Sequence, residues 1–181
     1  MSKPREKKIA VKQVGEIFRR LDKEHIEAGR RLIFSGSYQA LIAVVLSAQT
    51  NDHQVNRVTP RFFVRFPNVE VLGQAEPAEV ETYIKSVGLF RSKAANLVAA
   101  ARMINTEYQG VVPNNFLQLL SLPGVGRKTA NVLLATVFDQ PGLGVDTHVL
   151  RVSNRLGLAH SDHPEKVEII LKSFFPSHQW G

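Results

Sequence analysis

The sequence predicts an all-α protein, and three observations carry the prediction. Apolar residues recur at helical spacing along almost the whole chain, alternating patterns typical of strands are scarce, and glycine or proline separates the apolar segments. With 181 residues, of which 44% are hydrophobic, the chain can bury a core in one domain or in two small ones.

The first two helices are expected to differ in burial. A basic start leads into an amphipathic helix with Val14, Ile17, Phe18 and Leu21 on one face, and a polar stretch follows through Gly36. Ser37 is expected to cap the second helix. Residues 38–46 are apolar nearly all round, so this helix should be central.

The remaining helices are expected in order along the chain. They are a helix lined by Val55, Val58, Phe62 and Phe66 that ends at Pro67, and helices over 80–87, 91–104, 116–122, 128–138, 147–156 and 164–175. The last of these is expected to serve packing.

The charge balance favours a polyanionic partner. Lys and Arg number 23 against 16 Asp and Glu, which gives a net charge of +7 and predicts salt-sensitive binding. Binding to anionic lipid, or solubility alone, would account for the same charge. The sequence lacks both a run of roughly 18 apolar residues and the apolar core of a signal peptide, so a cytoplasmic or nucleoid location is expected, with no membrane partner.

The sequence contains no cysteine, which excludes disulfides, thiol nucleophiles, zinc fingers and cysteine-held iron–sulfur clusters within these residues. His148, His160 and His163 have no ligand spacing around them, so no metal site is expected.

Residues 122–131 read Leu-Pro-Gly-Val-Gly-Arg-Lys-Thr-Ala-Asn, and this turn between two apolar helical segments predicts a helix-hairpin-helix over about 114–138. Its glycines expose backbone N–H groups at the start of a helix, an arrangement that suits a phosphate. The residues expected to contact DNA here are Gly124, Val125, Gly126, Arg127 and Thr129.

A carboxylate, Asp146, follows the hairpin within Val145-Asp-Thr-His148. Lys128 opens a helix roughly 16 Å long. The connection 139–145, which contains Pro and Gly, can span up to roughly 23 Å, enough to return the chain to Lys128. An amine and a carboxylate at two helix starts suit a sugar phosphate with positive charge developing on its anomeric carbon.

For Lys128 to act as a nucleophile its amine must be neutral, and deprotonating an ordinary lysine at pH 7 costs about 4.6 kcal/mol. The positive end of its helix supplies only about 0.3–1 kcal/mol. Partial burial of Lys128 and the charge of Arg127 are therefore expected to supply most of the cost. Asp146 would stabilise the ammonium, so its expected benefit is to accept a proton or to stabilise an oxocarbenium-like transition state.

Simpler interpretations exist for each of these residues. Asp146 alone is most simply the N-cap of the following helix, while Lys128 and Lys93 alone are solvated lysines or phosphate contacts. Gln49 would be an ordinary polar residue at a helix end, and Leu89 a core residue.

Two glycine turns are followed by similar short sequences, which form an internal repeat. Lys93-Ala-Ala-Asn96 echoes Lys128-Thr-Ala-Asn131, each just inside a new helix. Two such turns on one side of a bundle would grip the DNA backbone on either side of a lesion, or the match is a coincidence.

Four ordered blocks resemble the endonuclease III branch of the helix-hairpin-helix DNA glycosylases. They are Leu46-Ser-Ala-Gln-Thr-Asn-Asp52, Ile84-Lys-Ser-Val-Gly-Leu-Phe-Arg-Ser-Lys93, Leu122-Pro-Gly-Val-Gly-Arg-Lys-Thr-Ala-Asn131 and Val145-Asp-Thr-His-Val149. The resemblance extends from about Ser37 to Trp180. It implies a helical bundle over 30–140 that carries the hairpin, and a second helical lobe made of 1–29 together with 141–181.

The resemblance also implies a function, a bifunctional glycosylase and abasic-site lyase of base excision repair. Lys128 would attack C1′ of a flipped nucleotide, expel the base, form a Schiff base and cleave the strand by β-elimination, with Asp146 as the essential carboxylate. The adenine-removing branch lacks this lysine, so duplex DNA with oxidised pyrimidines or abasic sites is the expected partner of a monomeric enzyme. A monofunctional glycosylase and a non-catalytic DNA-binding module are the alternatives.

Flipping a base leaves a hole in the stack that inserted side chains can fill. Gln49 and Leu89 match the family's residues for this purpose, whereas Asp52 lies in a shared block without an assigned role.

One departure from the family lies at the end of the sequence. Family members continue past His178-Gln-Trp180 to four cysteines that hold a [4Fe–4S] cluster, which cannot form without cysteine, so no cofactor is expected in this chain. A shortened form, or a lineage without the cluster, would explain the departure. The second lobe is expected to be incomplete and to expose apolar surface.

Overall fold

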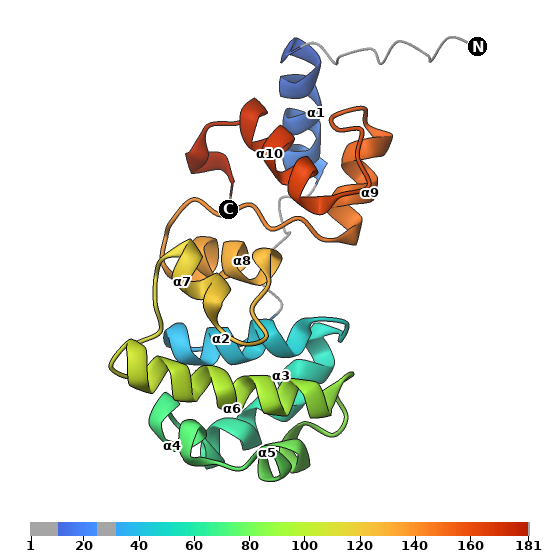
Figure 1. Ribbon diagram of the computed structural model, residues 1–181. Helices are drawn as coiled ribbons and strands as arrows, with labels where there is room; N and C mark the ends of the chain where they lie inside the picture. Colours follow the sequence, from blue (N-terminus) through green and yellow to red (C-terminus); the bar gives the residue numbers. More distant parts are fainter. Residues whose placement is uncertain (1–10, 25–31, 181) are drawn as a thin grey trace, which may run out of the picture. The chain divides into compact units, whose positions relative to one another are not determined.

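A computed structural model describes residues 11–24 and 32–180, and they are helical (Figure 1). The helices are α1 (Val11–Glu24), α2 (Gly36–Ser47), α3 (Asp52–Arg65), α4 (Val69–Gln74), α5 (Pro77–Ile84), α6 (Phe90–Glu107), α7 (Phe116–Ser121), α8 (Arg127–Val137), α9 (Thr147–Arg155), α10 (Pro164–Phe174) and the 3-10 turn η1 (Ser177–Gln179). No strand occurs among the described residues, and the all-α prediction is confirmed.

The contacts within the chain divide the described residues into two units. The larger unit contains residues 32–144, and the smaller contains 11–24 together with 145–180. Across both described ranges, no helix is long and apolar enough to cross a membrane.

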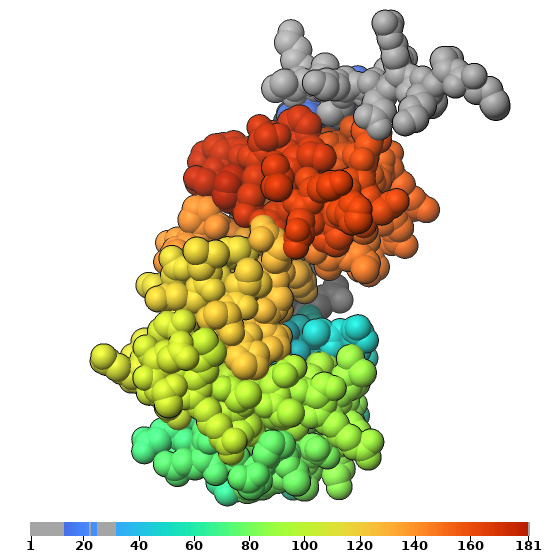
Figure 2. All heavy atoms as spheres, in the orientation of Figure 1, coloured from blue at the N-terminus to red at the C-terminus, as the bar shows by residue number. Residues whose placement is uncertain are grey.

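Helix α2 is the centre of the larger unit. Every residue from Ala40 to Leu46 is buried, as the apolar sequence predicted. Helices α3, α6 and α8 all contact α2. Figure 1 shows α6 lying between α2 and the pair α4 and α5, and in Figure 2 the green and yellow segments of this unit form one closely packed face.

Two details of the larger unit differ from the prediction. Helix α2 starts at Gly36, so Ser35 rather than Ser37 occupies the N-cap, and its N–H donates to Oε1 of Gln39 at 2.9 Å. Helix α4 was not predicted. It is too short to display a helical period, and the side chain of Asn68 caps it by accepting the N–H of Val71 at 2.9 Å.

Helix α4 lies very close to α6. A Cβ added to Gly73 would lie 2.6 Å from Nδ2 of Asn105 and 3.4 Å from the carbonyl carbon of Ala101. Arg102 of α6 donates its Nε–H to the carbonyl of Gly73 at 2.9 Å. The small residue therefore permits both the approach and the hydrogen bond.

The smaller unit brings α1 against the C-terminal segment. The ring centroids of Phe18 and Phe175 lie 4.3 Å apart, and the indole N–H of Trp180 donates to the carbonyl of Phe175 at 2.9 Å. Val167 and Leu171 of α10 are buried, which confirms a packing function for that helix. Large apolar side chains are also exposed in this unit, namely Phe18, Leu21, Val152, Leu156 and Ile169.

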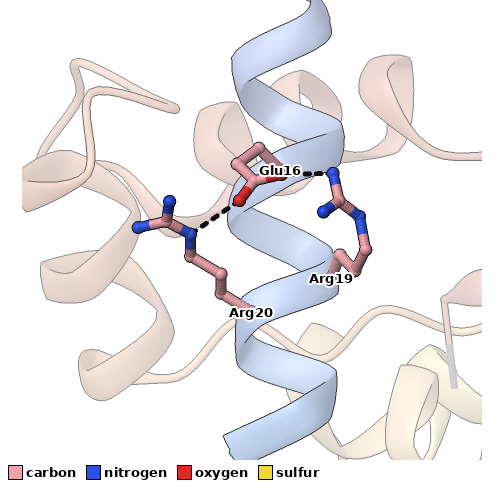
Figure 3. A network of polar contacts seen from close by, with 3 residues as sticks. All are labelled: Glu16, Arg19 and Arg20. Atoms are coloured by element: carbon pink, nitrogen blue, oxygen red, sulfur yellow. Dashed lines mark hydrogen bonds and ion pairs between the residues drawn. The ribbon is translucent and has the colours of Figure 1, made fainter.

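The exposed face of α1 carries a small charge network, which Figure 3 shows. Glu16 accepts hydrogen bonds from Arg19 and Arg20, the latter at 2.7 Å from its Nε. The hydrogen bond from Arg20 lowers the pKa of Glu16 below its ordinary value. Ion pairs this exposed contribute little to stability, so α1 depends on its apolar face for its position.

The close contact at Gly73 predicts a loss of stability on substitution. Gly73→Ala should lower the free energy of unfolding by about 1–3 kcal/mol, because the added methyl group must displace Asn105. Gln74→Ala, at an exposed position of the same helix, should change it by less than about 0.5 kcal/mol. Urea unfolding followed by circular dichroism measures both, and equal values would contradict the prediction.

Candidate functional site

The hairpin predicted from the sequence connects α7 to α8 in the larger unit. Gly124, in its turn, has a φ of +81°, which favours glycine. A Cβ added there would also lie 2.9 Å from the Cβ of Asn96 in α6. Glycine satisfies both conditions at once. Asn96 belongs to the first copy of the short repeat, Lys93–Asn96, so this copy supports the turn that precedes the second copy, Lys128–Asn131.

The start of α8 is open for an external acceptor. Its N-cap is Gly126, which has no side chain to bond the first N–H groups of the helix. Among the described residues, no protein oxygen accepts a hydrogen bond from the N–H of Gly124 or Gly126. These two N–H groups and the N-terminus of α8 can bind the oxygens of one phosphate group.

Two of the residues predicted to contact DNA have side chains that are buried within the unit. The side chain of Val125 is 6% exposed and its N–H donates to the carbonyl of Leu122 at 3.0 Å, while Thr129 is 8% exposed. Their side chains stabilise the turn and the first turn of α8, and the DNA contact predicted for these two residues stays a prediction.

The two basic residues that follow the turn differ in their surroundings. The guanidinium of Arg127 lies over the ring of Phe116, 5.0 Å from its centroid. Lys128 is exposed, so the partial burial predicted for it is wrong. Within the larger unit, nothing covers the amine from a large substrate.

The connection after α8 returns along that helix, as its length predicted. A Cβ on Gly142 would overlap the carbonyl oxygen of Asn131, and a Cβ on Gly144 would lie 3.4 Å from the carbonyl oxygen of Lys128 and 3.6 Å from its Cγ. Two glycines thus let the chain run in backbone contact with α8. The return brings Gly144 next to Lys128.

Asp146 begins α9 in the smaller unit. Its Oδ1 accepts the N–H groups of His148 and Val149 at 2.9 and 2.8 Å, which confirms the N-cap interpretation. The second carboxylate oxygen has no part in these two bonds. Asp146 and Lys128 belong to different units, and their pairing at one site stays a prediction.

The two residues predicted to fill a gap in the DNA stack share an unusual backbone conformation. Gln49 has a φ of 55° and Leu89 a φ of 57°, in the left-handed region that costs a residue with a side chain roughly 1–2 kcal/mol. Gln49 is exposed and Leu89 is 60% exposed, so the interpretation of Leu89 as a core residue is wrong.

The structure brings these two turns together at one end of the larger unit. A Cβ added to Gly88, just before Leu89, would lie 3.1 Å from the carbonyl oxygen of Gln49. The side-chain amide of Gln54 donates to Oγ of Ser86 at 2.5 Å. The end of α2 and the start of α6, which carry the turns, lie on the same side of this unit in Figure 1.

The sequence interpretation missed the burial of Lys93. It is 6% exposed rather than solvated, and burial lowers its pKa. Its ammonium donates to the carbonyls of Leu46 and Ala48 at 2.8 and 2.6 Å, and to Oγ1 of Thr50 at 3.2 Å. A signal was present, because Lys93 occupies the same helical face as the buried residues Leu97, Ala100 and Ile104.

The site offers no ligand set for a metal. Within the described ranges, no three His, Cys, Asp or Glu side chains gather as a metal-binding group. Because the sequence has no cysteine, its residues do not fit a cysteine-held cluster.

Comparison with known proteins agrees with this geometry. Residues 42–177 match the family of HhH-GPD superfamily base excision DNA repair proteins. The endonuclease III of Rickettsia conorii is 44% identical over 86% of this chain and 74% of its own length. That of Escherichia coli strain K12 is 39% identical over 91% of this chain and 81% of its own length.

A solved structure gives the same result. The structure of a trapped endonuclease III–DNA covalent intermediate, in an estranged-adenine complex, superposes with a TM-score of 0.91. It is 38% identical in sequence and covers 95% of this chain and 81% of that one.

The helical hairpin and the buried central helix thus define a repair protein of the helix-hairpin-helix class. The chain belongs to the HhH-GPD superfamily of base excision DNA repair proteins and, within it, to the endonuclease III family. It is accordingly a DNA glycosylase and abasic-site lyase of base excision repair, as its four sequence blocks predicted.

The glycine contact after α8 predicts sensitivity to a single methyl group. Gly142→Ala should force the connection away from α8, displace the chain that leads to Asp146 and lower strand cleavage by up to about 100-fold. Gly15→Ala, where nothing lies within 4 Å of the added Cβ, should leave cleavage unchanged. Cleavage of a labelled duplex with one abasic site measures the difference, and equal rates would contradict it.

Glycine substitutions at the two left-handed residues should lower DNA cleavage without lowering stability. Gln49→Gly and Leu89→Gly relieve backbone strain, so the free energy of unfolding should stay unchanged or rise by up to about 1 kcal/mol. Cleavage at a lesion in duplex DNA should fall by roughly tenfold, because the gap is no longer filled. Urea unfolding and cleavage are measured on the same preparations.

Gln109→Gly is the matched control for these two variants. Gln109 has a φ of 54° and lies outside the two turns, so its substitution should give the same stability change without a loss of cleavage. A loss of cleavage in all three variants would contradict the assignment of the turns.

Proposed function

We propose that this chain acts on oxidised pyrimidines and abasic sites in duplex DNA as a monomer in the cytoplasm or nucleoid, and that Lys128 is its nucleophile. One observation carries the proposal. Lys128 is exposed at the open start of α8, and its backbone carbonyl and Cγ lie next to Gly144, two residues before Asp146.

The chemistry follows from the position of the amine. Its lone pair attacks C1′ of the nucleotide, and the bond from C1′ to the base breaks with the electron pair leaving on the base, which takes up a proton. Opening of the sugar ring then leaves an imine between Nζ of Lys128 and C1′. Removal of a proton from C2′ expels the 3′ phosphate by β-elimination, and water releases the lysine. A trapped covalent intermediate has been solved for an endonuclease III with DNA, which supports this route.

The negative charge of Asp146 would act on the same sugar. One oxygen is occupied by the N–H groups of His148 and Val149, and these bonds fix the direction of the carboxylate. The other oxygen is available to stabilise positive charge at C1′ or to accept the proton of the attacking amine. The N-cap and the catalytic carboxylate are thus two functions of one side chain.

Binding would begin at the phosphate backbone. The N–H groups at the start of α8, together with Arg127, would hold one phosphate next to the reacting sugar, while the net charge of +7 attracts the duplex. Gln49 and Leu89 would enter the stack from their paired turns, opposite and beside the flipped nucleotide.

Borohydride trapping tests the nucleophile. Wild-type protein incubated with duplex DNA that contains thymine glycol or an abasic site, with borohydride present, should give a covalent protein–DNA band. Lys128→Ala should give none, and Lys166→Ala, which removes an exposed lysine from α10, should retain the full band. A band of normal strength from Lys128→Ala would rule out this lysine as the nucleophile.

Substitutions of Asp146 separate its charge from its capping function. Asp146→Asn keeps an N-cap acceptor, so stability should be retained while cleavage falls by about 100-fold or more. Asp146→Ala should lose the activity and also about 1 kcal/mol of unfolding free energy. Normal cleavage by Asp146→Asn would limit Asp146 to capping α9.

A further inference from the structure

We infer that Lys93 is a positioning residue for DNA recognition: its ammonium holds the two turns that carry Gln49 and Leu89 in the conformation that fills the gap left by a flipped nucleotide. The inference deepens the proposed function and rests on it for the task of the two turns. Lys93 itself does not touch the substrate.

The hydrogen bonds of Lys93 surround Gln49. Its ammonium bonds the carbonyls of Leu46 and Ala48 on one side and the hydroxyl of Thr50 on the other, at 2.8, 2.6 and 3.2 Å. The last carbonyls of a helix have no partner inside the helix and form its negative end. An ammonium has three donors, and here three acceptors from one short segment satisfy them.

The same residue is fixed to the turn of Leu89 through its backbone. The N–H of Lys93 donates to the carbonyl of Leu89 at 3.0 Å, in the first turn of α6. One residue therefore binds the turn of Leu89 with its main chain and the turn of Gln49 with its side chain. Neither turn can shift without breaking a bond to Lys93.

Two further contacts join the turns directly. Gly88 lies against the carbonyl of Gln49, where an added Cβ would come within 3.1 Å, and Gln54 is hydrogen-bonded to Ser86. These contacts link the segment after α2 to the segment before α6 independently of the lysine. They show that the two turns form a single structural unit.

A buried ammonium is a costly way to fill this space. Removing a charge from water is unfavourable, and an apolar side chain of similar length would pack without that cost. A residue with a side chain also keeps a left-handed backbone conformation only where its surroundings stabilise that conformation. Gln49 and Leu89 are both left-handed and both exposed, so their side chains contribute little of that support, and the contacts of Lys93 supply it.

The first test compares two forms of the same substrate. In Lys93→Met the apolar stem is kept and the ammonium is removed. Strand cleavage at an abasic site in duplex DNA should fall by about tenfold to 100-fold, because the gap must be filled there. Borohydride trapping on the same strand without its complement should be unchanged, because a single strand has no stack to repair. Lys166→Met, an exposed position that loses the same charge, should behave as wild type on both.

The second test reads the insertion itself. A duplex carries a tetrahydrofuran abasic analogue opposite 2-aminopurine, and the change in fluorescence at saturating protein reports the disturbed stack. The measurement is made in a Lys128→Ala background, so it needs no covalent chemistry. Lys93→Met should reduce the change, and Lys93→Arg, whose guanidinium can also donate to several carbonyls, should recover part of it.

A milder variant guards against loss of folding. Gly88→Ala leaves Lys93 intact but presses the turn against the carbonyl of Gln49, so it should show the same selective loss on duplex DNA, to a smaller extent. Thermal unfolding of each variant is recorded alongside.

The outcomes separate the inference from the proposed function. Normal duplex cleavage and normal fluorescence in Lys93→Met, or an equal loss on duplex and single-stranded DNA, would overturn the positioning role. A wild-type protein that traps neither substrate would overturn the nucleophile instead, while the fluorescence comparison would still decide the role of Lys93.

Discussion

The larger unit depends on the burial of one helix that is apolar on every side. Because Ala40 to Leu46 present no polar face, helices must surround α2, and α3, α6 and α8 do so. This constraint also places the functional segments. The helix of Lys128 packs on α2 directly, and the end of α2 is where Lys93 of α6 binds its carbonyls. Packing of the core and placement of the site therefore have the same cause.

Much of the fold and part of the site could be predicted from the sequence. The helical period and the Pro-Gly-Val-Gly turn predicted the fold and the hairpin, since both are local signals. Chain length between Lys128 and Asp146 predicted the return along α8, because only reach was needed. The N-cap at Asp146 was predicted from residue type and position, and the hydrogen bonds to His148 and Val149 confirm it.

What the sequence did not reveal depended on contacts between distant segments. The carbonyls that bind Lys93 lie more than 40 residues earlier in the chain. A local sequence pattern does not identify the hydrogen-bond acceptors of a buried ammonium. The burial of the Val125 side chain within the turn was not predicted either. The exposure of Lys128 was likewise hidden, since burial is a property of the assembled unit. Helix α4 was not predicted because a helix of six residues is too short to show a helical period of apolar residues.

The paired left-handed turns have a consequence for how an intact duplex is searched. Their shape is set when the chain folds, so the entropy of ordering them is lost once and not again at each encounter with DNA. If Gln49 and Leu89 enter the stack as proposed, the free-energy cost that remains at every base pair is the cost of opening the DNA itself. A mispaired or damaged position opens at lower cost than a sound one. A rigid probe of this kind converts local weakness of the double helix into selectivity, before any atom of the base itself has been recognised.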